Sequence, residues 1–204
     1  MWKKQQELAE LRRQERIGDL LLLLQHDHVY TNGWRGDRSN LLADDATLSR
    51  IGAAYHVVER GGDITYHGPG QLVAYPILNL RGVASGVRDY IARLETVVIR
   101  TLATFGIEAR TIPGLIGVWV DDAKIAAVGV KVRRGITYHG FALNVDPNLD
   151  YFSHIIPCGL ERASVTSMSS ILHRGITVDE VQPVCRAAFA DVFGLDLRSG
   201  RLPG

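Results

Sequence analysis

Cys158 is the residue whose type and surroundings most directly suggest chemistry in this sequence. It stands in the stretch Ile-Ile-Pro-Cys-Gly-Leu over 155–160, and it follows Lys124 by 34 positions. A cysteine is a strong nucleophile only as the thiolate, with an ordinary pKa of about 8.5, and a nearby ammonium group favours that anion. Pro157 and Gly159 favour a non-helical backbone and leave the thiol uncrowded. A thiol nucleophile with a cationic activator is typical of an acyl transferase.

Each of these residues also has an ordinary structural interpretation. Cys158 fits a small buried hydrophobic residue as well as it fits a nucleophile. Lys124 opens the apolar strand Ile125–Val130, where it either extends into solvent at the strand end or points into a pocket. Cys185 is assigned to the core, because it shares one face of the last predicted helix with Val181, Ala188 and Val192.

A block of glycines and polar residues over 60–71 has the most unusual composition in the chain. It reads Arg-Gly-Gly-Asp-Ile-Thr-Tyr-His-Gly-Pro-Gly-Gln. Glycines bring a backbone close to a ligand and free its N–H groups, and the polar side chains add hydrogen-bonding groups. Such a segment can cradle a phosphate, stabilise an oxyanion or shape a channel for a chain-like substrate. A tight hairpin with an ordinary polar face is the structural alternative.

The block follows neither of the common nucleotide-binding glycine patterns. It lacks the glycine-lysine-serine of a phosphate-binding loop, and Gly-x-Gly-x-x-Gly does not occur in it. His67 and His139 could in principle form a metal pair, but no cysteine or carboxylate stands at ligand spacing beside them. We therefore expect neither a metal nor a cofactor.

The composition is that of a soluble globular protein, with 46% hydrophobic and 22% charged residues in 204. We expect one domain over 1–204, and a monomer. The net charge of +1 gives no reason to expect nucleic-acid binding, and no apolar run approaches the roughly 18 residues that span a membrane. Two cysteines without a signal-peptide core favour the cytoplasm. Lys131, Arg133 and Arg134 are typical of a solvated strand face and would also suit an acidic carrier.

Hydrophobic periodicity predicts more strands than helices, with the helices between groups of strands. Thr177 and Glu180 have the spacing of a capping box at the start of the last helix. This order predicts an α+β domain with a mixed, largely antiparallel sheet flanked by helices. The expected helices cover 3–16, 86–105, 164–172 and 178–193, the expected strands cover 19–25, 28–31, 55–59, 63–66, 72–79, 107–111, 116–121, 124–133 and 136–145, and 36–45 is expected to be a loop.

Three local patterns refine this expectation. The run Leu20–Leu24 predicts a buried strand, and Pro76 predicts that its strand is irregular or near an edge. Arg134-Gly135 is a plausible turn of an antiparallel hairpin. The sequence Ile-Thr-Tyr-His-Gly occurs at 64–68 and again at 136–140, which indicates two related pocket walls or chance.

Five stretches carry these residues in a fixed order along the chain. They are His28–Gly33 (His-Val-Tyr-Thr-Asn-Gly), Arg60–Pro76, Lys124–Val130 (Lys-Ile-Ala-Ala-Val-Gly-Val), His139–Val145 (His-Gly-Phe-Ala-Leu-Asn-Val) and Ile156–Gly159 (Ile-Pro-Cys-Gly). In this order they resemble the motifs of the lipoyl(octanoyl) transferase family. The resemblance extends from about residue 17 to the end of the chain.

The resemblance implies transfer of an octanoyl group from octanoyl-acyl carrier protein to the target lysine of lipoyl domains. Those domains belong to 2-oxoacid dehydrogenase complexes and to the glycine cleavage H protein. It also implies a fold like the catalytic domains of biotin and lipoate protein ligases. Cys158 and Lys124 would form a dyad, in which Cys158 carries the acyl group as a thioester and Lys124 stabilises the thiolate and helps to deprotonate the attacking amine. The implied substrate-binding residues are Arg60, Gly61, Gly62, Asp63, Ile64, Thr65, Tyr66, His67, Ala127, Val128, Gly129, Gly140, Phe141 and Ala142.

Two departures from the family pattern concern the N-terminal edge. The chain begins almost in its first helix, without the short strand that the family usually has there. Asn32 stands where an apolar residue is more usual. Both would affect the docking of partners and not the dyad.

Three rival functions remain to be weighed. An ATP-dependent lipoate ligase on the same fold also uses a pocket lysine. It needs no nucleophilic cysteine, and we would expect a glycine triplet followed by His-Asp in place of residues 67–70. A non-catalytic acyl-binding or carrier-binding protein would form no covalent acyl adduct. A cysteine protease would need a His–Asn or His–Asp signature, and none surrounds Cys158.

Overall fold

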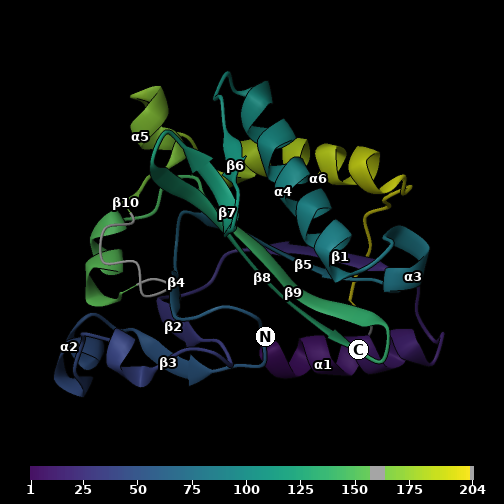
Figure 1. The fold of residues 1–204 in the computed structure, drawn as a ribbon, viewed down its shortest axis with the longest axis horizontal. Coiled ribbons are helices and arrows are strands. Elements are labelled where there is room, and N and C mark those ends of the chain that lie inside the picture. The colour runs from purple at the N-terminus through teal and green to yellow at the C-terminus, as the bar shows by residue number, and fades with distance from the viewer. Residues whose placement is uncertain (157–163, 203–204) are drawn as a thin grey trace.

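The apolar runs of the chain form two sheets, shown in Figure 1 in a computed structural model that describes residues 1–156 and 164–202. The prediction for Cys158 therefore lies outside the described residues. The larger sheet has seven strands, in the order β1-β5-β9-β8-β7-β6 with β10 beside β8, and the smaller has the order β3-β2-β4. The strands are β1 Leu20–Leu24, β2 Val29–Asn32, β3 Ala54–Val57, β4 Thr65–His67, β5 Gln71–Ile77, β6 Arg110–Ile112, β7 Leu115–Val120, β8 Ala123–Arg133, β9 Ile136–Asn144 and β10 Ser164–Val165.

Helices cover both faces of the larger sheet. Figure 1 shows α4 and α6 on one face and α1 on the other. The pairs β2–β3 and β8–β10 are parallel, and the other strand pairs are antiparallel. The predicted α+β class with a mixed, largely antiparallel sheet is thus confirmed. The helices are α1 Trp2–Arg13, α2 Asp45–Arg50, α3 Leu80–Val83, α4 Val87–Thr104, α5 Met168–Leu172 and α6 Val178–Phe193, with 3-10 turns η1 Arg38–Asn40 and η2 Leu149–His154.

The two long helices form where the apolar spacing predicted them. Helix α4 buries Tyr90, Leu94, Val98 and Leu102 on one stripe, which packs against the sheet and α6. Helix α6 starts at the predicted capping box, since Thr177 accepts from the Glu180 backbone and the Glu180 side chain accepts from the Thr177 backbone. Cys185 is buried in the core as predicted, and burial raises the pKa of its thiol to about 12.

Strand β1 is less buried than its five leucines suggest. It lies at the edge of the larger sheet, and Leu22 is buried while the other four leucines are half-buried. Alternate leucines meet the two faces: Leu21 and Leu23 pack beside α4 and α6, while Leu20 and Leu24 pack beside α1. Because helices cover both faces of β1, apolar residues are needed at every position of the strand. A continuous apolar run is therefore compatible with an edge strand as well as with a central one.

Two other expectations are corrected. The predicted helix over 164–172 is a short strand followed by a helix, because β10 pairs with β8 and Ser167 then caps α5 by accepting from the Ser170 backbone. The stretch 36–45, predicted to be a loop, contains η1 and the first residue of α2. Helices α2 and α3 were not predicted. Both are too short for a periodic pattern, and Asp44 and Asn79 cap them.

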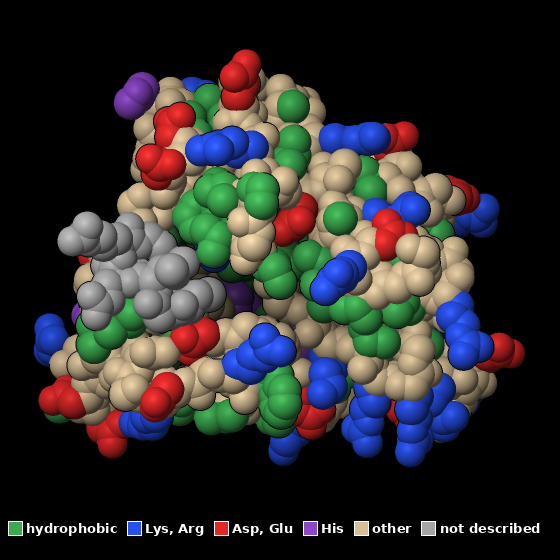
Figure 2. All heavy atoms as spheres, viewed as in Figure 1, with side chains coloured by type: hydrophobic (Ala, Val, Ile, Leu, Met, Phe, Trp, Pro, Cys, Tyr) green, Lys and Arg blue, Asp and Glu red, His purple; other side chains and the backbone are tan. Residues whose placement is uncertain are grey.

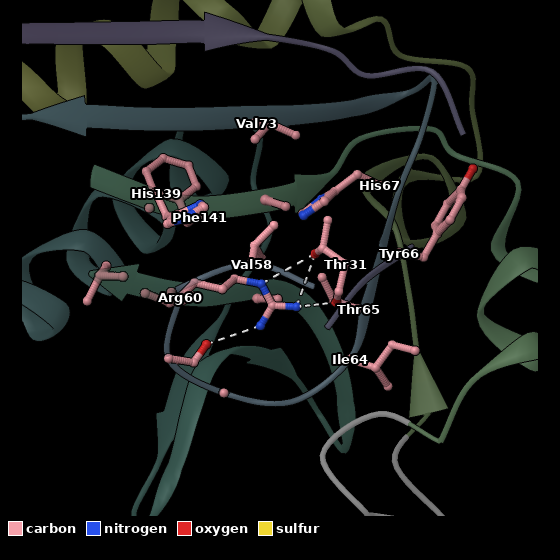
Figure 3. A pocket seen from close by; sticks show the side chains of 18 of the residues that line it. Thr31, Val58, Arg60, Ile64, Thr65, Tyr66, His67, Val73, His139 and Phe141 are labelled. Carbon is pink, nitrogen blue, oxygen red and sulfur yellow. Dashed lines mark hydrogen bonds between the residues drawn. The ribbon is translucent and has the colours of Figure 1, made fainter. Parts of the chain in front are cut away.

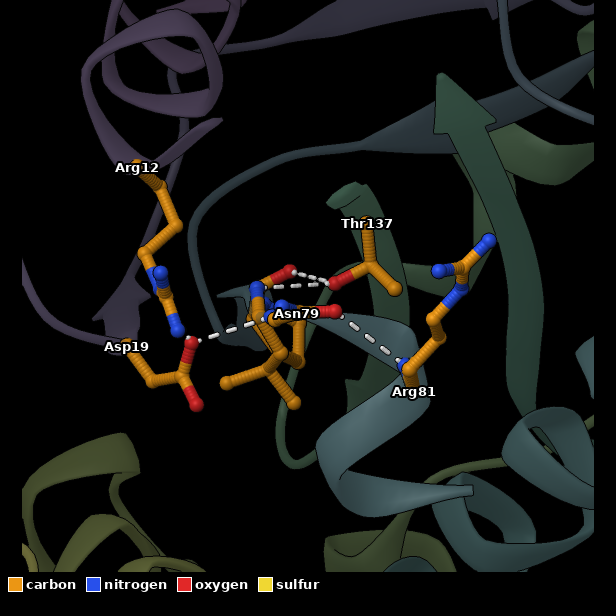
Figure 4. A network of polar contacts seen from close by, with 7 residues as sticks. Arg12, Asp19, Asn79, Arg81 and Thr137 are labelled. Carbon is orange, nitrogen blue, oxygen red and sulfur yellow. Dashed lines mark hydrogen bonds and ion pairs between the residues drawn. The ribbon is translucent and has the colours of Figure 1, made fainter. Parts of the chain in front are cut away.

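A hydrogen-bonded network joins α1 to the start of β9 (Figure 4). Arg12 pairs with Asp19 at 2.6 Å, and the same carboxylate oxygen accepts from the Asn79 backbone N–H at 3.0 Å. The Asn79 side chain accepts in turn from the Arg81 backbone, which caps α3. Thr137 donates to the Pro76 carbonyl at 2.9 Å and accepts from the Leu78 N–H at 3.0 Å. These bonds fix α1 across the sheet.

Strand β9 bends where it passes Pro76. The β5–β9 ladder ends at the pair Ala74–Phe141, so Pro76 lies beyond it, while β5 stays paired with β1 through Pro76; the predicted irregularity is thus confined to the β9 side. His139 has a positive φ of 57°, and its backbone N–H donates to Gln5 of α1 at 2.8 Å instead of to a strand. At Gly140 a Cβ would lie 2.2 Å from the Ala74 carbonyl oxygen. Only glycine therefore lets the two backbones come this close.

Replacing Gly140 with alanine tests this contact. The new methyl group would meet the Ala74 oxygen and, at 2.7 Å, the ring of Pro76. We expect Gly140→Ala to lower the free energy of unfolding by about 2–4 kcal/mol in urea denaturation. Gly82→Ala is the matched control, because a Cβ at this helical position meets no atom within 4 Å. Equal stabilities for the two variants would contradict the packing role of Gly140.

Candidate active site

A cavity of about 1060 Å³ lies between the two sheets. Figure 2 shows its mouth as a hollow bordered by hydrophobic side chains, with histidine atoms visible inside. Strands β4, β5, β8 and β9 contribute to its wall, together with the segment before β4 and residues of α1 and α4. Lys124 and all of the predicted substrate-binding residues line it: Arg60, Gly61, Gly62, Asp63, Ile64, Thr65, Tyr66, His67, Ala127, Val128, Gly129, Gly140, Phe141 and Ala142.

Lys124 lies near the start of β8 and is half-buried. Its Nζ lies 4.8 Å from the ring centroid of Trp119, its partner on β7. Its side chain crosses β7 at Gly117, where a Cβ would come within 3.3 Å of the Lys124 Cε. Its backbone oxygen accepts from the Thr166 N–H at 3.0 Å, next to β10. The surroundings of Lys124 therefore fix its stem and keep its ammonium group at the cavity.

A chain of buried hydrogen bonds connects His67 to this end of β8. Gln71 accepts from His67 Nδ1 at 3.1 Å and donates to the Tyr66 carbonyl at 3.2 Å and to Asn144 Oδ1 at 3.0 Å. Asn144 donates to the Thr166 carbonyl at 2.9 Å. Since the Thr166 N–H donates to the Lys124 carbonyl, these hydrogen bonds connect the polar block to the backbone of Lys124 by way of β4, β5 and β9.

Arg60 holds the polar block together. Its guanidinium donates to the Thr31 carbonyl and hydroxyl and to the Gly61 carbonyl (Figure 3), and the residue is only 8% exposed. The Gly61 backbone N–H donates to the Val130 carbonyl at 2.9 Å, which attaches the block to β8. Asp63 accepts from the Asn40 side chain at 2.7 Å and from the Ile64 backbone at 2.6 Å. In the described structure Arg60 and Asp63 thus shape the cavity wall.

The predicted glycines and alanines of β8 and β9 differ in their roles. Gly129 pairs with Gly140 across the two strands, and Ala127 pairs with Ala142. A Cβ at Gly129 would lie 3.0 Å from the Gly61 carbonyl, so this glycine makes room for the polar block. Ala127 and Ala142 line the cavity with methyl groups only, which leaves space for a ligand beside them.

The repeated Ile-Thr-Tyr-His-Gly sequence supplies a histidine to each of two walls. His67 and His139 both line the cavity, from β4 and β9. Burial, with a smaller effect of the positive charge of Arg60, lowers the pKa of each to about 3. Both imidazoles are therefore neutral at neutral pH. The Nε2 atom of His139 is buried without a hydrogen-bond partner among the described residues.

Tyrosine and histidine rings stack behind the polar block. The Tyr66 hydroxyl bonds to His28 Nδ1 at 2.8 Å, and its ring stacks on Tyr151 with centroids 5.0 Å apart. Asn32, the departure noted in the sequence, is buried at the end of β2 and donates to the Tyr55 hydroxyl at 3.2 Å. Its Oδ1 is buried without a hydrogen-bond partner among the described residues, and Asn32 is not one of the residues that line the cavity.

Several lining residues were not predicted. Gln71 and Val73 belong to the motif Arg60–Pro76, but the sequence assigned no role to either of them. Val87 and Ile91 were predicted only as part of the apolar stripe of a helix. Leu115 and Ile116 also line the cavity and are partly exposed. Only the helix spacing gave a signal for Val87 and Ile91, and this spacing does not distinguish a core residue from a cavity wall. No group of three or more His, Cys, Asp or Glu residues within 1–156 and 164–202 could hold a metal ion, and no helix in these ranges is long and apolar enough to span a membrane.

The fold is that of the lipoate protein ligase catalytic domains. A structure of lipoate-protein ligase A bound with ATP superposes with a TM-score of 0.77 over 98% of this chain and 85% of that chain, at 18% identity. A bi-partite lipoate protein ligase from Thermoplasma acidophilum gives 0.75 over 98% of this chain and 83% of that chain, also at 18% identity. Identities this low show the shared fold alone.

The chain belongs to the lipoyl protein ligase A/B catalytic domain family, whose model matches residues 1–190. Within it, an octanoyltransferase from Solibacter usitatus is 50% identical over 196 residues, which cover 96% of this chain and 88% of that protein. An octanoyltransferase from Gloeobacter violaceus is 45% identical over 201 residues, covering 98% and 87%. The family resemblance inferred from the motifs is confirmed.

The buried histidines make stability depend on pH in a defined direction. Their pKa is about 3 in the folded chain and about 6.5 when unfolded, so the unfolded chain binds more protons between these values. Stability is therefore complete above pH 6.5 and falls as the pH drops toward 3. We expect each histidine to account for a loss of about 2 kcal/mol between pH 7.5 and pH 5. Urea denaturation at both pH values measures this loss, and His139→Phe should reduce the difference by one histidine's share. An unchanged difference in the variant would contradict the burial of a neutral His139.

Proposed function

We propose that this chain transfers an octanoyl group from octanoyl-acyl carrier protein to the target lysine of lipoyl domains, through a thioester on Cys158. The octanoyltransferases among its relatives support the reaction. The observation that carries the proposal is that one cavity gathers Lys124 with every described residue predicted to bind the substrate. The acceptors are the lipoyl domains of 2-oxoacid dehydrogenase complexes and of the glycine cleavage H protein.

The reaction takes place in two acyl-transfer steps. The Cys158 thiolate attacks the carbonyl carbon of the octanoyl thioester, the bond to the carrier sulfur breaks, and the carrier leaves as a thiol after taking up a proton. The lysine amine of a lipoyl domain then attacks the acyl-enzyme, so that a C–N bond forms and the Cys158 C–S bond breaks. As an ammonium group Lys124 stabilises the thiolate and gives its proton to the leaving carrier sulfur. As the resulting amine it then takes the proton that the attacking lysine amine loses.

The cavity suits an apolar chain with a polar reactive end. Val73, Phe141 and the methyl groups of Ala127 and Ala142 line it, while Lys124 supplies a cation. Its volume of about 1060 Å³ lies at the upper end for small-molecule sites. This leaves room for the pantetheine arm or the acceptor lysine beside the acyl chain.

The proposal extends to the setting of the reaction. Residues 1–204 act as one catalytic domain, because both sheets contribute to the same cavity. The chain acts as a monomer in the cytoplasm, with no metal or cofactor. A lipoate ligase would have the same fold, and a requirement for ATP would distinguish it from an octanoyltransferase.

Intact-protein mass spectrometry tests the thioester. After mixing with octanoyl-acyl carrier protein without ATP, we expect the chain to gain one octanoyl group that hydroxylamine removes. Cys158→Ala should not gain it. Cys185→Ala is the matched control and should gain it fully, since Cys185 is buried in the core. Octanoate attachment to a lipoyl domain only with ATP would establish the ligase instead, and no modification under either condition would leave a binding protein.

Lys124→Ala tests the second member of the dyad. Loss of the Lys124 amino group removes both the cation that stabilises the thiolate and the amine that accepts the proton, so the rate of octanoyl transfer should fall by about 100-fold or more. Single-turnover transfer to a lipoyl domain measures the rate, and thermal unfolding checks that the variant is folded. A rate within a factor of about two of wild type would exclude the proposed role.

A further inference from the structure

Glu95 is a buried carboxylate in the apolar stripe of α4. It is 8% exposed, and its helix neighbours Leu94 and Val98 belong to the main core. Ile91, one turn earlier, lines the cavity. Carboxylates are seldom this buried without a compensating partner, because burial favours their neutral form. The environment of Glu95 therefore requires an explanation.

The backbone of β7 fixes the Glu95 side chain. The Gly117 N–H donates to Glu95 Oε1 at 2.8 Å. Gly117 has a φ of 127°, and a Cβ there would lie 2.7 Å from the Ala126 oxygen and 3.3 Å from Lys124 Cε. The stem of Lys124 thus crosses the same glycine whose amide binds Glu95. A side chain at this position would displace the lysine.

The charges of Glu95 and Lys124 act on each other at this crossing. Burial raises the pKa of Glu95, while the bond from Gly117 and the positive charge of Lys124 oppose that rise. The carboxylates on the neighbouring β7–β8 turn, Asp121 and Asp122, are exposed, and Asp122 lies 3.6 Å from Arg110. The ring of Trp119 faces the ammonium group from β7. Among the described residues, Glu95 is thus the carboxylate positioned to balance the charge of Lys124.

We propose that Glu95 is a positioning residue, whose carboxylate is the counter-charge that keeps Lys124 extended across Gly117 as an ammonium group at the cavity. This inference rests on the proposed function of Lys124. An ammonium group is the form that stabilises a thiolate, and a carboxylate nearby favours it over the neutral amine. The bond from Gly117 prevents the carboxylate from rotating away, so the charge is fixed in place.

Glu95→Gln separates this electrostatic role from a structural one. The glutamine carbonyl still accepts from the Gly117 N–H, but the negative charge is lost. Glu95→Asp keeps the charge on a shorter side chain. Asp89→Asn is the matched control, at a half-buried carboxylate on the same helix that accepts from Ser85 and Arg93.

The direct readout is the rate of Lys124 labelling by acetic anhydride, followed by peptide mass spectrometry. The lysines of the chain are Lys3, Lys4, Lys124 and Lys131, so Lys131 on the same strand serves as an internal reference. In Glu95→Gln, Lys124 should be acetylated several-fold faster than in the wild type at the same pH, because the neutral amine is no longer disfavoured. Labelling of Lys131 should not change, and Asp89→Asn should behave as wild type.

Octanoyl transfer gives the second readout. The alkaline limb of the kcat profile should move to lower pH in Glu95→Gln, and kcat at neutral pH should fall about tenfold with KM little changed. Glu95→Asp should restore part of both effects. If Glu95→Gln labels and transfers as wild type does, Glu95 only binds β7 and the inference is overturned. If the wild type transfers no octanoyl group, the proposed function fails, while the labelling shift still tests the coupling of Glu95 to Lys124.

Discussion

The buried amide of Gln71 is the interaction on which the arrangement of the cavity depends. It lies where β4 turns into β5, is 1% exposed, and bonds His67, the Tyr66 backbone and Asn144. Asn144 carries the connection to Thr166, and so to the backbone of Lys124. An unpaired buried amide would cost about 1–3 kcal/mol for each group left without a partner. This one side chain therefore holds the smaller sheet, the centre of the larger sheet and Lys124 in a fixed arrangement.

Close backbone packing keeps the cavity open on the other side. Gly140 lets β9 approach the carbonyl of Ala74, and Gly129 makes room for the polar block on β8. The bend at His139 frees a backbone N–H that Gln5 of α1 satisfies. Helix α1 thus completes the cavity wall at the point where β9 is not fully paired with its neighbouring strand. At Gly129 and Gly140 the missing side chain makes room for neighbouring backbone. The space for a ligand lies beside Ala127 and Ala142 on the same two strands.

The sequence predicted the elements with strong local signals and the residues that share the cavity. The stripe of α4, the capping box at Thr177 and the hairpin of β8 and β9 depend on near neighbours, so their patterns were sufficient. The segment over 164–172 was misjudged because β10 forms only by pairing with the distant Lys124. Glu95 was overlooked for a similar reason: within its helix it is one charged residue in an apolar stripe, and its meaning comes from Gly117 on another strand.

The charges around the cavity favour an uncharged acyl thioester over a nucleotide triphosphate. Two of the lining imidazoles, His67 and His139, are neutral at neutral pH, since burial lowers their pKa to about 3. Arg60 donates to Thr31 and Gly61, and the other lining cations of the described structure, Lys3 and Arg35, are exposed. A triphosphate requires several inward-facing cations or metal ions, whereas a thioester requires one cation beside its nucleophile. Lys124, with Glu95 across Gly117, supplies that single charge and balances it.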